Sequence, residues 1–424
     1  MKMKKLQILT LLILLSTCQT RAQSPDKVST IDTITVKRAL YLATKKNPGL
    51  QKLSETINQK KAELIGNSGL ADPVLSYSRE GIGNNSSAGF DEQRIGITQD
   101  FTFPTATSRI TDRIQSEIEA LQLEYENALL LLREEIKKSY SQLQYGLEIL
   151  HLGESELEIS KGVFEAVKLK FESGEATKIE MLKAKIQVDE AQNSISEAQN
   201  YLHKARYTLF NQIGLETENQ KYTINFPDTL YYKKVVILQS DILSTFYEMP
   251  GVRSKKKLTE AAENQLLVAN ASYYPNISLN LFGQDFGTGF RSMGFEVGLS
   301  LPLWFGSNQK SLVENALASK RISDQNYREE LLLMKKEVEI AWHGYEAADE
   351  NLGRFSSGIL ADSEQLLNLT TEGYKLGEID FLNLLEARRT YLTSSKRYYD
   401  YLLDYHFRLI ELEKFSPKEF LYND

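Results

Sequence analysis

The sequence predicts a mainly helical chain made of two tandem repeats, each with a β-hairpin followed by very long coiled-coil helices. Three observations lead to this fold class. Proline and glycine residues recur in the same order about 200 positions apart, and each repeat contains two segments of strand-like alternation. A proline-free helical stretch of about 70 residues then follows each hairpin.

The duplication is visible in four pairs of matched motifs. The first half contains Asn47-Pro48-Gly49-Leu50, Asp72-Pro73, Phe103-Pro104 and Gly174-Glu175, and the second contains Met249-Pro250-Gly251-Val252, Tyr274-Pro275, Leu301-Pro302 and Gly377-Glu378. Because proline and glycine fix local backbone geometry, their recurrence in order indicates that the architecture itself is repeated. We expect the first repeat over residues 23–215 and the second over residues 242–424.

The chain is expected to begin with a secretory signal peptide over residues 1–22. A basic start precedes a short apolar run over residues 6–15, and Ala22 offers a small residue for cleavage. The competing interpretation makes Cys18 the lipidated residue of a lipoprotein signal, although Thr17 is bulkier than the residue usually found before such a cysteine. Cleavage after Ala22 is favoured, and either route takes the protein out of the cytoplasm.

The charge balance excludes some partners. Removal of residues 1–22 leaves 46 basic and 57 acidic residues, a net charge of −11, with no dominant basic patch. This composition argues against nucleic acid as a partner. With Cys18 removed or lipidated, no thiol remains for a disulfide, thiolate catalysis or a cysteine metal site.

The hairpins are expected over about residues 73–103 and 275–301. Apolar residues in them alternate with small or polar ones, a period of two that places the apolar set on one face. The alternating positions are Leu75, Tyr77, Ile95, Ile97 and Phe101 in the first hairpin and Ile277, Leu279, Leu281, Phe295, Val297 and Leu299 in the second. Each segment has about the length of a tilted transmembrane strand.

Two interpretations of these hairpins remain open. They are either half-buried hairpins on a soluble sheet or strands of a transmembrane barrel. Four strands cannot close a barrel, and open strand edges are not tolerated in lipid. If the strands span a membrane, the chain must therefore oligomerise.

Long helices are expected over about residues 105–213 in the first repeat and 303–413 in the second. A continuous helix from Thr105 to Ser173 would reach roughly 100 Å, which is longer than a globular core requires and fits a coiled-coil tube. Residues 216–241 are neither strongly helical nor repeated, so we expect them to bridge the two repeats.

The far ends of these helices have specific turn signals. Gly174 and Gly377 are expected to adopt the left-handed conformation that ends a helix. Thr177, with Glu180 three residues later, predicts a capping box at the start of the next helix, and Asp380 is expected to cap the equivalent helix in the second repeat. The pattern predicts a tight helical hairpin at the same place in each repeat.

No catalytic or cofactor-binding constellation is found. The sequence has no Gly-x-Ser-x-Gly motif and no phosphate loop. Glu148 and His151 have the Glu-x-x-His spacing of a carboxylate-bridged metal site, but such a site needs a second copy, and the other repeat has none. We therefore expect no enzymatic activity, no cofactor and no metal site.

Taken together, these motifs resemble the TolC-like outer membrane efflux proteins over nearly the whole mature chain, from Ile34 to Glu413. The sharpest motif, Tyr374 to Arg389, is similar to the family's tip motif of an aromatic residue, a glycine and Leu-Leu-x-Ala, and Phe171 to Ala184 is a looser copy. Gly298 to Gly306 is similar to the strand-to-helix junction of the subgroup that serves heavy-metal exporters. The family often has serine where this chain has Thr177 and Asp380, which can still cap a helix.

The resemblance implies a homotrimer with a 12-stranded barrel in outer membrane lipid above a 12-helix periplasmic tunnel. It also implies a passive conduit that works with a periplasmic adaptor protein and an inner-membrane pump. The adaptor-docking residues at the periplasmic tips would be Gly174, Glu175, Thr177, Gly377, Glu378 and Asp380. Repeated threefold, Glu175, Glu378 and Asp380 would either ring the entrance and favour cations, or serve only as helix caps and dipole partners.

The leading interpretation is the outer membrane channel component of a tripartite efflux system, with a large periplasmic part. Its exported substrates would be small molecules, and metal cations are one class considered. The alternative is a secreted or periplasmic coiled-coil scaffold protein without a pore. A lipoprotein adaptor is disfavoured, because no β-sandwich or lipoyl-like segment is found. Partition into the outer membrane separates a channel from a scaffold.

Overall fold

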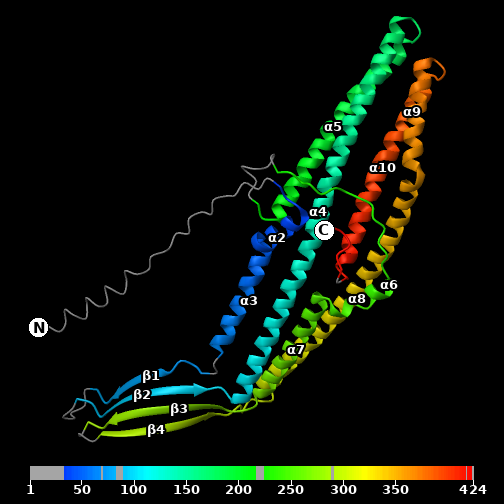
Figure 1. Cartoon of the computed structure of the whole chain (residues 1–424). Helices are drawn as coiled ribbons and strands as arrows, with labels where there is room; N and C mark the ends of the chain where they lie inside the picture. The colour runs from blue at the N-terminus through cyan, green and yellow to red at the C-terminus, as the bar shows by residue number, and fades with distance from the viewer. Residues whose placement is uncertain are drawn as a thin grey trace, which may run out of the picture.

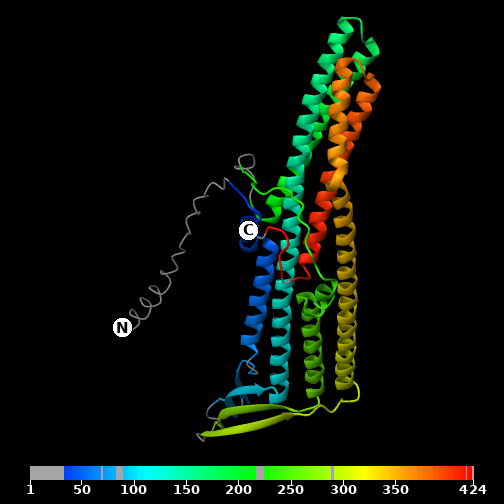
Figure 2. The same cartoon turned by 45° about the vertical axis from the view of Figure 1, so that its right-hand side comes forward.

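Long helices run side by side along most of the molecule, and a four-stranded sheet projects from one end of them (Figures 1 and 2). The computed structural model describes residues 33–67, 70–82, 89–215, 224–287, 291–416 and 418–422. The expected signal peptide over residues 1–22, with Cys18, lies outside the described residues.

The elements of the two halves follow one another in the same order. The first half contains α2 (Val36–Lys46), α3 (Pro48–Gly66), β1 (Val74–Glu80), β2 (Glu92–Phe101), α4 (Pro104–Glu172) and α5 (Lys178–Gln212). The second contains α6 (Gln239–Leu243), the 3-10 helix η1 (Phe246–Glu248), α7 (Pro250–Ala271), β3 (Asn276–Asp285), β4 (Arg291–Ser300), α8 (Asn308–Arg354), the π-helical turn η2 (Phe355–Ile359), α9 (Leu360–Leu376) and α10 (Phe381–Glu413).

Proline begins the helices at equivalent places in both halves. Pro48 and Pro250 occupy the first turns of α3 and α7, where the missing N–H group costs nothing. The Asn47 side chain accepts hydrogen bonds from the N–H groups of Gly49 and Leu50, so it caps α3. Pro104 likewise begins α4, which continues without interruption for 69 residues.

The second long helix differs from its expected course. Residues 303–307, including Trp304 and Phe305, form turns, and α8 begins at Asn308 instead of about residue 303. The 47, 5 and 17 residues of α8, η2 and α9 nevertheless equal the 69 residues of α4. The extra residues of the second repeat therefore lie before the start of α8. The π-helical turn at 355–359 lies between α8 and α9.

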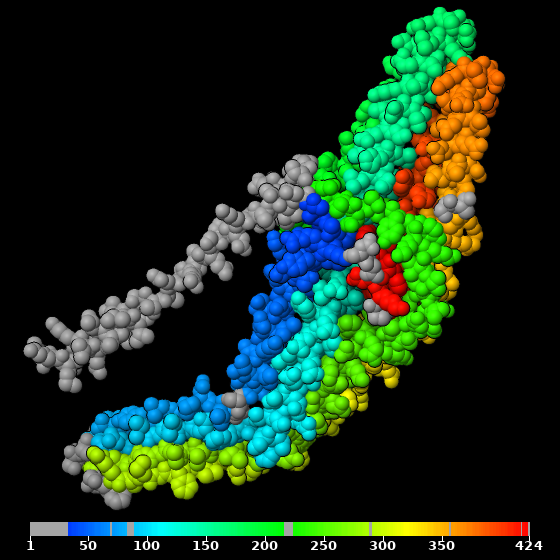
Figure 3. Space-filling model, in the orientation of Figure 1, coloured from blue at the N-terminus to red at the C-terminus, as the bar shows by residue number. Residues whose placement is uncertain are grey.

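The four strands form one antiparallel sheet in the order β1-β2-β3-β4. Residues paired across neighbouring strands share a face, so the pairs Leu75–Ile97, Ile97–Leu281 and Leu281–Phe295 form a continuous apolar row. The alternation predicted from the sequence is confirmed, because the register aligns the apolar positions of all four strands on one face. Figure 3 shows the sheet projecting as a thin slab from the helices.

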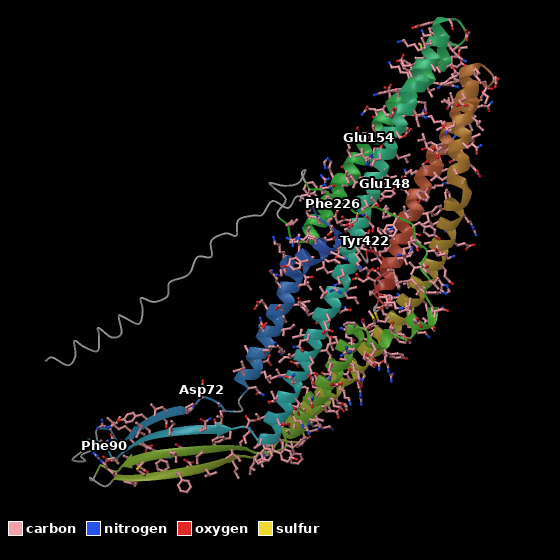
Figure 4. All side chains as sticks on the ribbon, viewed as in Figure 1. Asp72, Phe90, Glu148, Glu154, Phe226 and Tyr422 are labelled. Carbon is pink, nitrogen blue, oxygen red and sulfur yellow. The ribbon has the colours of Figure 1, made fainter. Side chains whose placement is uncertain are left out.

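The cores lie among the helices. One apolar cluster surrounds Tyr140 and Phe210 in the first half, and another surrounds Tyr345 and Tyr405 in the second. Tyr422 packs against both clusters, because the segment after α10 turns back along the bundle and inserts beside α4 (Figure 4). The two halves are thus joined through packed side chains near the middle of the helices.

Candidate functional site

The two helical hairpins end in the same backbone conformation. Gly174 after α4 has φ of +84° and Gly377 after α9 has φ of +81°, both in the left-handed region. The Glu175 N–H donates to the carbonyl of Lys170 at 2.7 Å, and the Glu378 N–H donates to the carbonyl of Gly373 at 2.8 Å. These bonds satisfy carbonyls that the helix ends leave without intrahelical partners, and the predicted glycine turns are confirmed.

Side-chain caps begin the returning helices. The Glu180 N–H donates to the Thr177 hydroxyl at 3.2 Å, and the Thr177 N–H donates to the Glu180 carboxylate at 2.6 Å. This reciprocal pair is the predicted capping box. In the second hairpin the Asn383 N–H donates to the Asp380 carboxylate at 2.8 Å, which confirms Asp380 as the N-cap of α10.

The three acidic residues of the tips have different surroundings. The carboxylate of Asp380 is occupied by its capping bond, which a helix N-terminus favours. Glu175 and Glu378 are exposed, and neither forms an ion pair with a residue that the structure describes. Of the three, Glu175 and Glu378 are therefore the carboxylates free to face a solute or a partner.

The tips of the two hairpins are tied to one another. The ammonium group of Lys170 on α4 donates to the backbone carbonyl of Tyr374 at 2.6 Å and lies 4.4 Å from the centre of the Tyr374 ring. That carbonyl belongs to the last turn of α9, where a cation is electrostatically favoured. Tyr374 also packs against Phe381 at a ring distance of 5.9 Å. One apolar cluster therefore contains side chains from both hairpins.

A buried arginine connects the hairpins farther from the tips. Arg388 of α10 is 2% exposed and donates to Gln187 at 2.8 Å, to Glu156 at 3.2 Å and to Ser160. Burial lowers the pKa of Arg388 and raises the pKa of Glu156. The positive charge of Arg388 partly offsets the rise in the pKa of Glu156. The sequence interpretation missed this role, although Arg388 follows Phe381 and Leu384 at the spacing of one buried helix face.

A groove runs between α4 and α9 just behind the tips. Its cavity measures about 250 Å³ and is lined by Val163 and Ala166 of α4 and by Leu367, Thr371 and Tyr374 of α9. The groove is therefore lined by side chains from both halves of the chain.

The sheet provides a second surface. On its apolar face Leu75, Phe295 and Met293 are 73%, 70% and 94% exposed. The opposite face carries polar and charged residues in the same register. Figure 4 labels Asp72 and Phe90, which precede β1 and β2 at opposite ends of this first hairpin.

Within the described ranges, no three His, Cys, Asp or Glu side chains gather where they could hold a metal ion. His151 is exposed, and its Nδ1 lies 3.5 Å from Oε2 of Glu154 on the next turn of α4. No helix in the described part of the chain is long and apolar enough to cross a membrane.

Comparisons with known proteins identify the family. The family model described as outer membrane efflux protein matches residues 75–215 and 248–416, which cover most of the chain. The chain therefore belongs to the outer membrane efflux protein family. The matched residues include both hairpins of the sheet and both helical tips.

One curated relative is nodulation protein T of Rhizobium leguminosarum bv. trifolii. It is 24% identical over 298 residues, which cover 66% of this chain and 62% of the relative. The match therefore spans less than two thirds of that relative's own length.

Solved structures share the fold. The outer membrane channel CmeC of Campylobacter jejuni is 17% identical, with a TM-score of 0.79 over 90% of this chain and 85% of that one. The outer membrane protein VceC of Vibrio cholerae is 16% identical, with a TM-score of 0.78 over 90% and 95%. The open-state outer membrane channel MtrE of Neisseria gonorrhoeae is 17% identical, with a TM-score of 0.74 over 93% of each chain.

Proposed function

We propose that three copies of this chain form a passive efflux conduit in the outer membrane, with a large periplasmic part. The conduit passes small solutes from the periplasm to the outside, and an inner-membrane pump supplies the energy. A periplasmic adaptor links the two by docking on the helical tips. Family membership and the shared fold of the solved channels support this proposal.

The edges and the two faces of the sheet are the main support for this assembly. β1 and β4 are edge strands of the described sheet, and an unpaired edge is not tolerated in lipid. The exposed apolar row suits lipid on one face, and the polar row suits a water-filled lumen on the other. Pairing of β4 with β1 of the next copy removes both edges, and three copies supply twelve strands.

The helices favour the same assembly. Near the sheet α3 packs on α4, α4 on α7 and α7 on α8, so α3 and α8 lie at the ends of a curved row (Figure 2). Ile65 of α3 and Leu332 of α8 are exposed on these outer helices. A neighbouring copy on each side would cover such residues and close the row into a tube.

The tips are the proposed adaptor-docking site. Gly174, Glu175, Thr177, Gly377, Glu378 and Asp380 form two similar turns, and the apolar groove behind them opens between the hairpins. In this arrangement Glu175 and Glu378 supply the free negative charge of the entrance, whereas Asp380 acts mainly as a cap. Metal cations are the proposed substrate class that this charge would favour most.

Membrane partition and conductance test the proposal. Purified full-length protein in a planar lipid bilayer should give stepwise openings, and in cells it should fractionate with the outer membrane as a heat-modifiable oligomer. A protein that stays soluble without detergent and gives no openings would instead be the pore-less scaffold.

A further inference from the structure

The polar face of the sheet has an uneven distribution of charge. Among the described strand positions on this face, four residues are acidic and Arg94 is the one cation. The acidic residues are Glu80, Glu92, Asp100 and Glu296. Only Glu296 forms an ion pair with another described residue of the sheet, and its partner is Arg94.

Arg94 is held against the sheet by neighbouring side chains. Its guanidinium carbon lies 3.5 Å from the centre of the Phe282 ring, within the range of a cation–π interaction. Its Nη2 atom lies 3.2 Å from Oε2 of Glu296, and Nδ2 of Asn280 donates to the same oxygen at 3.3 Å. The cation is therefore both neutralised and fixed in position.

Phe282 departs from the alternation of the sheet. It occupies a polar-face position of β3, and its partners in the register are Gly96 on β2 and Gly294 on β4. A Cβ atom at Gly294 would lie 2.5 Å from Cζ of the Phe282 ring, so a glycine is needed there for the ring to extend over β4. The two glycines leave space for an aromatic platform on an otherwise polar surface.

We propose that Phe282, Arg94 and Glu296 set the preference of the conduit for cationic solutes. Phe282 holds Arg94 flat against the wall and Glu296 cancels its charge, so a passing solute meets the field of Glu80, Glu92 and Asp100. This inference rests on the proposed function, because the polar face lines a lumen only when copies close around it. Rings of carboxylates favour cations in a pore.

The sharpest test is a substitution that leaves the formal charge of the protein unchanged. In Phe282→Ala the platform is lost, so Arg94 can extend into the lumen and oppose cations. The potassium-to-chloride permeability ratio, taken from reversal potentials in planar bilayers, should fall by roughly twofold in 0.1 M salt and less at 1 M salt, where screening is stronger. The matched control is Leu281→Ala, which removes the adjacent large side chain from the opposite face and should leave the ratio unchanged.

Two further variants give a prediction of opposite sign. Arg94→Gln removes the cation and should raise the ratio, whereas Glu296→Gln leaves Arg94 without its counter-charge and should lower it. These two variants decide the question if Phe282→Ala does not assemble. An unchanged ratio in conducting Phe282→Ala channels, or shifts of equal sign in the two charge variants, would overturn the inference. Absence of openings from the unaltered protein would instead refute the conduit itself.

Discussion

Single residues end the helical hairpins. Gly377 has a left-handed backbone, and an added Cβ would meet nothing within 4 Å. Replacement by alanine should therefore cost about 1 kcal/mol from backbone strain alone. Gly162, inside α4, also has open space around it but an ordinary helical backbone, so Gly162→Ala should stabilise the protein by roughly 0.5–1 kcal/mol. Urea unfolding of the two variants in detergent measures the change in the free energy of unfolding for each. Changes of the same sign in the two variants would show that the turn geometry is not the cause.

His406 makes stability depend on pH. It is fully buried, its Nε2 lies 2.9 Å from the Tyr231 carbonyl, and burial lowers its pKa to about 4. Between that value and the usual pKa of about 6.5, the unfolded chain binds a proton that the folded chain does not. This contribution to stability is therefore present above pH 6.5 and is lost as the pH falls, by about 2 kcal/mol between pH 7 and pH 5.

Thermal unfolding across this range checks the His406 prediction. The melting temperature of the unaltered protein should fall more steeply from pH 7 to pH 5 than that of His406→Gln, which carries no titrating group at this position. Identical slopes for the two proteins would assign the acid sensitivity to other groups.

At the scale of elements, the segment after α10 fastens the two repeats together. The Tyr422 hydroxyl donates to Gln144 of α4 at 2.9 Å and lies 3.0 Å from the Ser141 hydroxyl. Its ring meets Tyr140 of the first repeat and His406 of the second. The N–H groups of residues 420 and 421 donate to Glu413, which pairs with the buried Lys137. Tyr422 adopts φ of +63°, a strained value that these contacts offset.

Removal of this ring should loosen the junction between the repeats. Tyr422→Ala should destabilise the protein by about 2 kcal/mol, since a partly buried aromatic ring that packs against both cores is lost. Tyr422→Phe keeps the ring and loses only the hydroxyl bonds, which should cost about 1 kcal/mol. Thermal unfolding followed by circular dichroism measures both. A loss below about 0.5 kcal/mol for Tyr422→Ala would mean that the segment does not couple the repeats.

Short sequence motifs predicted the helices and turns better than they predicted the contacts between helices. The glycine turns and the Thr177 capping box depend on neighbouring residues, so short motifs were sufficient to predict them. The buried Arg388 and the inserted Tyr422 depend on partners more than 200 positions away. Hydrophobic periodicity could place Arg388 on the buried face of α10, but it could not identify partners on distant helices or the left-handed backbone of Tyr422.

The start of the second long helix also differed from expectation for a local reason. The sequence from Pro302 to Ser307 connects β4 to α8, and its backbone forms successive turns through the carbonyls of Leu301 and Trp304. The apolar residues Leu303, Trp304 and Phe305 are exposed on these turns. Their apolar character is compatible with a helix, so periodicity alone extended the helix too far.

At the scale of the whole molecule, one chain is an incomplete structure. Its sheet exposes an apolar row and has β1 and β4 at its edges. Its helices α3, α4, α7 and α8 form an open curved row (Figure 2). If copies of the chain join side by side around one axis, the sheet edges become paired and the row of helices closes. In the proposed assembly the polar face, with Arg94 fixed on Phe282, would surround the path of the solute, and the two hairpin tips of each copy would meet the proposed periplasmic adaptor.

Electron cryo-microscopy of the full-length protein in lipid nanodiscs would show how the copies are arranged. We predict three copies around one axis, with β4 of each copy hydrogen-bonded to β1 of the next and with Phe295 facing lipid. The polar row that contains Arg94 should line a continuous lumen. A particle in which β1 and β4 remain unpaired, or in which the apolar row faces inward, would rule out the proposed trimeric conduit.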